Sequence, residues 1–141
     1  MPVAAGYLLA VACGPLGAWA AMQTGLALPG SACGASALLI LLLAAPVLEE
    51  SIFRGGLHAW LARRAPARLG CLSLANLVVA GVFGAMHAIH QQSSLMLLSA
   101  APALMMGWVW ELSGARLLAP VLLHAWYNLC IVVLSCYRST V

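Results

Sequence analysis

The sequence contains very little charge. Its 141 residues include six Lys plus Arg and three Asp plus Glu, and these are all arginine and glutamate, because neither lysine nor aspartate occurs. Soluble domains carry about a quarter charged residues, so a water-facing surface cannot be built from this composition. The chain is 65% hydrophobic with a mean hydropathy of +1.04. These values predict a single membrane domain over residues 1–141.

The sequence also lacks the alternating pattern of β-strands, internal repeats and any linker that would mark a second domain. It contains five long apolar segments instead, which we place at residues 3–22, 36–60, 69–90, 94–112 and 117–136. A transmembrane helix needs about 20 mainly apolar residues, and backbone groups in hydrocarbon must pair within the protein. We therefore predict an all-α bundle of about five transmembrane helices, in which neighbours cover the carbonyls freed by Pro15, Pro102 and Pro120. Pro46, one turn before the acid pair, is expected to bend the helix that carries it.

Basic residues are few and confined to short gaps. Arg63, Arg64 and Arg68 lie between the second and third segments, and Arg116 lies between the fourth and fifth. The positive-inside tendency places these gaps in the cytoplasm, with the N-terminus inside and Arg138 as the one exception. We expect the arginines to orient the chain in a membrane, with the lipid bilayer as partner, and not to bind nucleic acid. The first segment lacks a basic n-region, so we expect a retained helix.

Cysteine is present without a recognisable pattern. The five cysteines form no CxxC pair and no disulfide framework, and most lie within or at the edge of apolar segments. Cysteine in such positions behaves as a small hydrophobic residue. We therefore expect free, packed thiols.

The stretch "LEESIFRGG" interrupts this apolar chain with ionisable side chains. A charge at the bilayer centre costs about 2.5 to 3.5 kcal/mol on insertion scales, so such residues usually face the bundle interior and mark a functional site. Glu50 and Arg54 are four residues apart and share a helix face. We predict that they form an ion pair, which leaves Glu49 as the acid that is free to act as a general base.

The later segments supply polar partners. The third segment ends "GVFGAMHAIH", which places His87 one turn after Phe83, and the fifth contains "LLHAWYNL", which places His124 and Asn128 on one face. A glutamate and a histidine can deprotonate a water molecule, while a histidine and an asparagine can donate hydrogen bonds to an oxyanion. The predicted reaction is hydrolysis of a peptide bond.

These motifs resemble those of a known family. "EESIFR", "FGAMH" and "HAWYN" match the EExxxR, FxxxH and HxxxN motifs of the CAAX prenyl protease 2 and bacteriocin-processing family of intramembrane endopeptidases, over about residues 36–130. The resemblance implies that Glu49 and His87 activate water, that His124 and Asn128 form the oxyanion hole, and that Glu50 and Arg54 support the site. The stretches "GGLHAWLARR" and "SLANL" resemble the bacterial branch that processes C-terminal sorting tags of exported proteins. This resemblance implies a membrane-associated protein substrate and a bacterial inner membrane.

Three other interpretations fit the same residues. Glu49, His87 and His124 are a legitimate set of zinc ligands, although the resemblance implies no cofactor. The motifs could also provide polar packing in a non-catalytic scaffold or immunity protein. A proton-coupled transporter would use buried acids and histidines too, but five segments without an inverted repeat argue against it. We assign interfacial roles to His58, His90 and Glu111.

Straight helices do not bring these residues to one height. Counted from the arginine-rich gaps at about 1.5 Å per residue, Glu49 lies higher than His124, and His87 lies higher still. A common site therefore predicts that one helix is tilted, offset or only partly crossing, and we expect this of the third or fifth.

Overall fold

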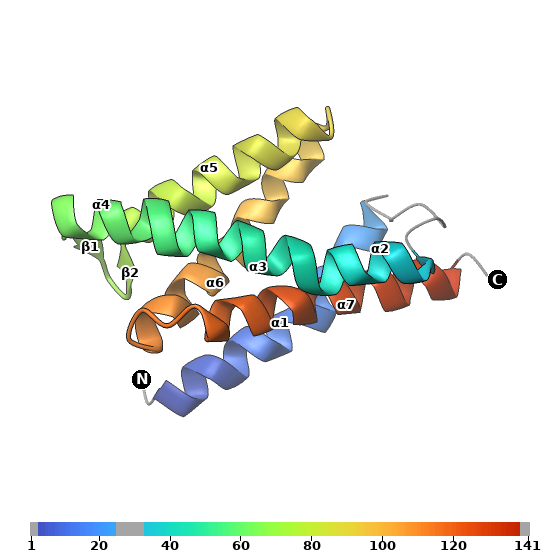
Figure 1. Ribbon diagram of the computed structural model, residues 1–141, viewed down its shortest axis with the longest axis horizontal. Helices are drawn as coiled ribbons and strands as arrows, with labels where there is room; N and C mark the ends of the chain where they lie inside the picture. Colours follow the sequence, from blue (N-terminus) through green and yellow to red (C-terminus); the bar gives the residue numbers. More distant parts are fainter. Residues whose placement is uncertain (1–2, 25–32, 139–141) are drawn as a thin grey trace.

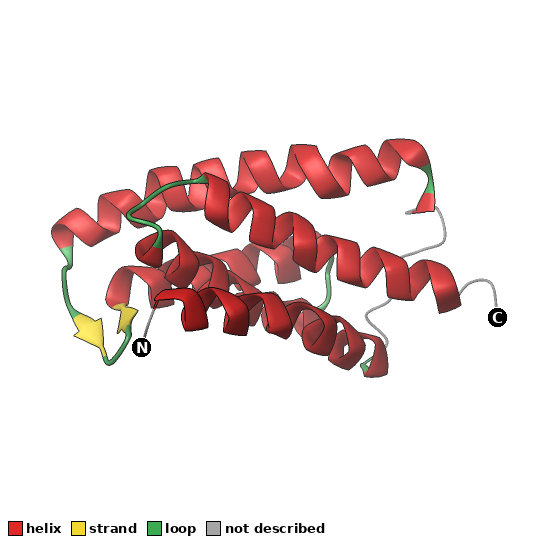
Figure 2. Ribbon diagram, turned by 90° about the horizontal axis from the view of Figure 1, so that it is seen from below, coloured by secondary structure: helices red, strands yellow, loops and turns green. Residues whose placement is uncertain are grey.

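The structure is a computed structural model, and it describes residues 3–24 and 33–138. It is a bundle of helices that run along one long axis, with a single small hairpin (Figures 1 and 2). The elements are α1 Val3–Gln23, α2 Ala35–Leu39, η2 Ile40–Ala44, α3 Ala45–Glu50, η3 Ser51–His58, α4 Ala59–Arg64, β1 Arg68–Leu69, β2 Leu72–Ser73, α5 Leu74–His90, η4 Ser94–Ser99, α6 Ala100–Leu112 and α7 Leu118–Arg138. The predicted all-α membrane bundle is confirmed.

Among the residues that the structure describes, four helical stretches are long and apolar enough to cross a membrane, namely Val3–Gln23, Ala35–Arg64, Ser94–Leu112 and Leu118–Tyr137. The third predicted segment is different. Its first residues form the antiparallel hairpin of β1 and β2, and α5 begins only at Leu74. With 17 residues, α5 is about 26 Å long, which is less than the roughly 30 Å of the hydrocarbon core. The prediction of a helix over 69–90 was wrong at its start, because Ser73 caps the helix by accepting a hydrogen bond from the Asn76 N–H.

The second segment forms one long helix from α2 to α4. At 30 residues it is about 45 Å long, and it extends past the start of α7 (Figure 1). Two stretches of it, η2 and η3, are π-helical and flank the acid pair at the end of α3. Straight helices of equal length would place Glu49, His87 and His124 at different heights. Because the long helix extends beyond α7 and α5 is short, these residues can lie at one height. π-Helical turns are uncommon and occur frequently at functional sites.

A carbonyl freed by proline in α1 is covered by a side chain of α7. Pro15 lacks the N–H that would pair with the carbonyl of Val11, and the indole Nε1 of Trp126 donates to that oxygen at 2.9 Å. The Tyr127 hydroxyl donates to the carbonyl of Ala10, one residue earlier, at 2.7 Å. The prediction that neighbours cover these carbonyls is confirmed for Pro15, and α1 is thereby joined to α7.

The core lies where α1, η3, α5, α6 and α7 meet. Its buried members are Ala10, Phe53, Val79, Ala80, Phe83, Ala103, Met106, Val109, Leu123 and Tyr127. Many large apolar side chains outside this core are exposed, including Leu8, Ile52, Leu118 and Tyr137. Such exposure would be unfavourable in water, but it suits a surface that contacts lipid tails.

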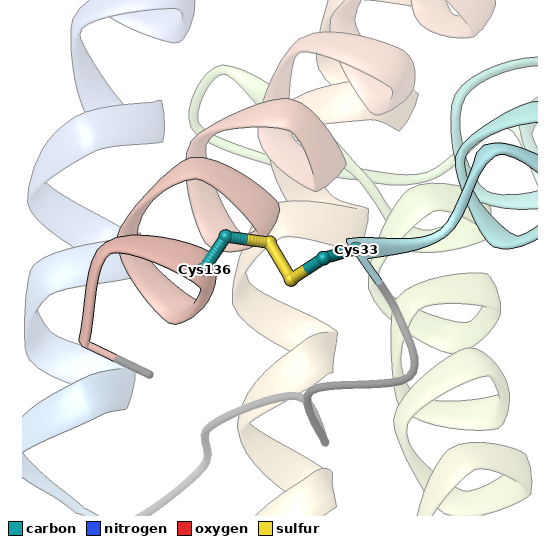
Figure 3. Close-up of a disulfide and its surroundings, with 2 residues drawn as sticks. All are labelled: Cys33 and Cys136. Atoms are coloured by element: carbon teal, nitrogen blue, oxygen red, sulfur yellow. A yellow bond between two sulfur atoms is a disulfide. The ribbon is translucent and has the colours of Figure 1, made fainter. Parts of the chain in front are cut away.

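Two cysteines correct the sequence-based expectation. Cys33, just before α2, and Cys136, near the end of α7, form a disulfide with a Cα–Cα distance of 6.0 Å (Figure 3). They are 103 residues apart in sequence, so only the antiparallel arrangement of the long helix and α7 brings them together. We call this the disulfide end of the bundle. The opposite end, which carries the end of α4, the hairpin and the start of α7 (Figure 1), is the arginine end, because Arg63, Arg64, Arg68 and Arg116 lie there.

Candidate active site

The acid pair ends α3, and its two members have different surroundings. Glu50 is fully buried and accepts a hydrogen bond from Arg54 Nε at 3.0 Å. Arg54 is fully buried too, and its second guanidinium nitrogen donates to the carbonyl of Ala103 at 2.9 Å. The predicted ion pair is confirmed, and a buried pair of this kind is tolerated because each charge has a partner and further hydrogen bonds.

The second oxygen of Glu50 contacts a helix that is distant in sequence. His124 Nδ1 lies 3.0 Å from Glu50 Oε1. A carboxylate can only accept hydrogen bonds, so Nδ1 carries a proton and donates a hydrogen bond to Glu50. This contact spans 74 residues, and no local sequence pattern predicts it. It orients the imidazole so that its other nitrogen, Nε2, faces Glu49.

Glu49 is less enclosed, with 30% of its side chain exposed. Its Oε2 lies 4.0 Å from His87 Nε2 and 3.9 Å from His124 Nε2. Among the residues that the structure describes, none donates a hydrogen bond to this oxygen. The site therefore combines one acid from the long helix with one imidazole from α5 and one from α7, around a gap that is too wide for direct hydrogen bonds but suits one small molecule.

His87 is held by the residue one turn before it. Its Nδ1 lies 3.0 Å from the carbonyl of Phe83, and its ring stacks on the Phe83 ring with 4.3 Å between centroids. A carbonyl oxygen only accepts, so Nδ1 carries the proton and the Nε2 of the neutral ring keeps a lone pair directed toward Glu49. Phe83 itself packs edge-on against Phe53 at 5.0 Å. The FxxxH spacing thus places both the carbonyl that accepts from His87 and the aromatic ring on which His87 stacks.

Asn128 makes a contact that the motif does not predict. Its Nδ2 donates to the carbonyl of Leu41 in η2 at 2.8 Å. In the π-helical frame Ala45 N–H pairs with the carbonyl of Ile40, five residues earlier, so the next N–H, at position 46, would pair with Leu41. That residue is Pro46, which has no N–H. Asn128 therefore replaces the missing donor and leaves one amide hydrogen for another acceptor.

The sequence-predicted residues do not all lie equally close. Glu49, His87 and His124 converge, and Glu50 and Arg54 support the imidazole of His124. Asn128 lies one turn beyond His124 on α7, and its described hydrogen bond goes to the long helix rather than to Glu49. Among the described residues, no group of three or more His, Cys, Asp or Glu side chains has the arrangement of a metal site. The zinc interpretation remains a prediction.

A second polar cluster lies toward the arginine end. Glu111 accepts from Ser73 Oγ at 2.5 Å and from Arg68 at 3.1 Å, and lies 3.2 Å from His58 Nε2. His58 is fully buried and packs against the Trp110 ring at 4.5 Å, so the interfacial role expected of it from its place in the sequence was wrong. Arg68, rather than Arg116, which lies five positions after Glu111 in the sequence, is the arginine paired with Glu111. This cluster joins η3, the hairpin and α6.

Comparison with known proteins agrees with the motifs. No curated protein and no solved structure matches the chain. A family model described as type II CAAX prenyl endopeptidase Rce1-like matches residues 30–130, which include the three motifs and every residue placed in the site above. The chain therefore belongs to the Rce1-like family of type II CAAX prenyl endopeptidases, a family of membrane proteases.

Proposed function

We propose that this protein is a glutamate-dependent intramembrane endopeptidase. The observation that carries the proposal is that Glu49 Oε2 lies within 4.0 Å of the free ring nitrogens of both His87 and His124, which come from separate helices. Family membership supports peptidase activity. The assignment of individual roles is our own.

Glu49 and His87 are the residues proposed to activate water. With Nδ1–H committed to Phe83, the His87 Nε2 lone pair and Glu49 Oε2 are both acceptors, separated by 4.0 Å. A water molecule between them can donate one hydrogen to each at bonds of about 2.8 Å. Its oxygen lone pair is then directed away from both, toward a bound carbonyl carbon. Such positioned bases contribute roughly 10²- to 10⁴-fold to the rate.

His124 and Asn128 are proposed to hold the oxyanion. Because Nδ1–H of His124 donates to Glu50, the ring can donate from Nε2 only as an imidazolium, and the Glu50 carboxylate stabilises that charge. The amide hydrogen of Asn128 that is not used by Leu41 is the second donor. Glu50 and Arg54 thus act on the reaction through His124, as positioning residues.

The proposed reaction is balanced without a cofactor. Water adds to the carbonyl carbon of the scissile bond, and Glu49 takes its proton. The same proton passes to the leaving nitrogen when the carbon–nitrogen bond breaks, which yields a new carboxyl terminus and a new amino terminus. The proposed substrate is a membrane-associated protein, and its cleaved segment is a C-terminal sorting tag of an exported protein in a bacterial inner membrane, as the resemblance of "GGLHAWLARR" and "SLANL" suggests.

The test is co-expression with a candidate substrate, followed by mass spectrometry of the cleaved ends. Wild type should give a defined new terminus, and Glu49→Gln and His87→Gln should abolish it while the protein remains inserted and abundant. His90→Gln is the matched control, since His90 is exposed at the end of the same helix, and it should cleave normally. Unchanged cleavage by Glu49→Gln would refute the proposal, and normal function without any cleavage would favour a scaffold or immunity protein.

A further inference from the structure

The two ends of the bundle differ in both charge and redox chemistry. The arginine end carries four arginines, Arg63, Arg64, Arg68 and Arg116, whereas the disulfide end carries one, Arg138. The positive-inside tendency places the arginine end in the cytoplasm. Disulfides persist in oxidising compartments and are rare in the cytosol, so Cys33–Cys136 independently places the other end outside. Both observations give the same orientation.

The site is closed toward the arginine end. From Glu49 the long helix continues toward that end through Glu50, Arg54 and His58, and each of these three side chains is fully buried. Phe53 and Met106 fill the same layer and are buried as well. Water or a peptide therefore has no open route to Glu49 through this layer.

The site is less enclosed away from this layer. The side chains of Glu49 and His87 are 30% and 28% exposed, although the Oε2 atom of Glu49 is itself buried. His87 is three residues from the end of α5, which corresponds to about 4.5 Å of helix rise, and the connection that follows is "HQQSS", whose His90, Gln91, Gln92 and Ser94 are exposed. A polar, non-helical connection at this position must contact water, since lipid cannot satisfy its backbone. Water therefore reaches within one helical turn of His87 from the disulfide end.

We infer that the site opens to the extracytoplasmic side of the membrane. The closed layer and the polar connection after α5 give the direction of the opening, and the arginines and the disulfide give the orientation of the bundle. Resting on the proposed function, this outward opening means that an exported substrate is held by an apolar membrane anchor and is cut beside the outer end of that anchor. The exposed apolar side chains next to the site, Leu48, Ile52, Met86 and Ile89, provide a lipid-facing surface along which such an anchor can approach. A substrate with its cleavage site in the cytosol would not reach Glu49.

Labelling with a membrane-impermeant maleimide tests this orientation without requiring catalysis. The exposed native Cys71, in the hairpin at the arginine end, is an internal reporter for the cytoplasm. Gln91→Cys reports the connection after α5, and His87→Cys reports the site itself. Labelled positions are identified by peptide mass spectrometry, and Ala88→Cys replaces His87→Cys if that variant fails to insert.

In intact cells, Gln91→Cys and His87→Cys should be labelled, and Cys71 should react only after permeabilisation. Labelling of Cys71 in intact cells would overturn the orientation. Labelling of Gln91→Cys but not of His87→Cys and Ala88→Cys would overturn the outward opening. Neither result depends on cleavage, so failure of this inference is distinguishable from failure of the proposed function, which the Glu49→Gln experiment decides.

Discussion

Replacing Asn128 with alanine should affect stability and catalysis by two separable routes. The side chain donates to the carbonyl of Leu41, whose backbone partner in the π-helical pattern would be residue 46, a proline without an N–H. Leaving that carbonyl unpaired should destabilise the protein by about 1–3 kcal/mol. Losing a donor to the oxyanion should lower kcat by about 10²- to 10³-fold.

The double variant Pro46→Ala/Asn128→Ala separates the two effects. Alanine at position 46 restores an N–H that can donate to Leu41, so we expect the double variant to recover most of the stability lost in Asn128→Ala. We expect its cleavage rate to stay low, because no group replaces the second amide hydrogen of Asn128. The free energy of unfolding is measured in mixed micelles with increasing SDS, and cleavage is measured with the co-expressed substrate.

A second cycle in the same helix is the matched control. Trp126 donates to the carbonyl freed by Pro15 in α1, which lies away from the site. Trp126→Phe should cost a similar 1–3 kcal/mol, Pro15→Ala should recover it, and cleavage by the folded protein should be unchanged throughout. Recovery of both stability and rate in the Asn128 cycle would show that Asn128 acts only through Leu41. Recovery of neither would refute the reasoning about Pro46.

Three further predictions concern the buried ion pair, the disulfide and metals. Arg54→Met leaves the buried Glu50 carboxylate without its partner and should lower the free energy of unfolding by about 3–5 kcal/mol. The control Arg64→Met removes an arginine stacked on Trp60 at 4.3 Å. It should lower that free energy by less than about 1 kcal/mol, measured by the same SDS unfolding. Cys33→Ser should abolish the mobility shift on reduction in a denaturing gel and cost about 2–5 kcal/mol, while Cys71→Ser should do neither; a persistent shift would contradict the pairing. Chelation of metals should leave cleavage by the purified protein unchanged, and loss of cleavage that zinc restores would establish the metal mechanism instead.

The local features of the site could be predicted from the sequence because they depend on helical periodicity. Glu50 and Arg54 are four residues apart on one helix, and so are Phe83 and His87, so each pair meets whatever the rest of the fold does. The same holds for the membrane class, since so few charges cannot cover a water-facing surface.

Contacts between helices were beyond such reasoning. The bond from His124 to Glu50, the disulfide of Cys33 with Cys136 and the cluster around Glu111 each join residues that are tens of positions apart. Whether such residues meet depends on helix offsets, and those depend on where α5 starts and on how far the long helix overhangs. The start of α5 has only the Ser73 cap as a local signal, which is weaker than a four-residue spacing, and the overhang of the long helix has none.

Composition and spacing alone thus determined that this chain is a membrane helix bundle with an acid pair and two histidine motifs, because burial of charge and the pitch of a helix are local physics. Tertiary structure alone decided that Glu49 faces two imidazoles, while both oxygens of Glu50 are paired with Arg54 and His124. It also decided that Asn128 covers a proline-freed carbonyl. These outcomes depend on how the π-helical turns rotate the long helix against α5 and α7, and only packing sets that rotation.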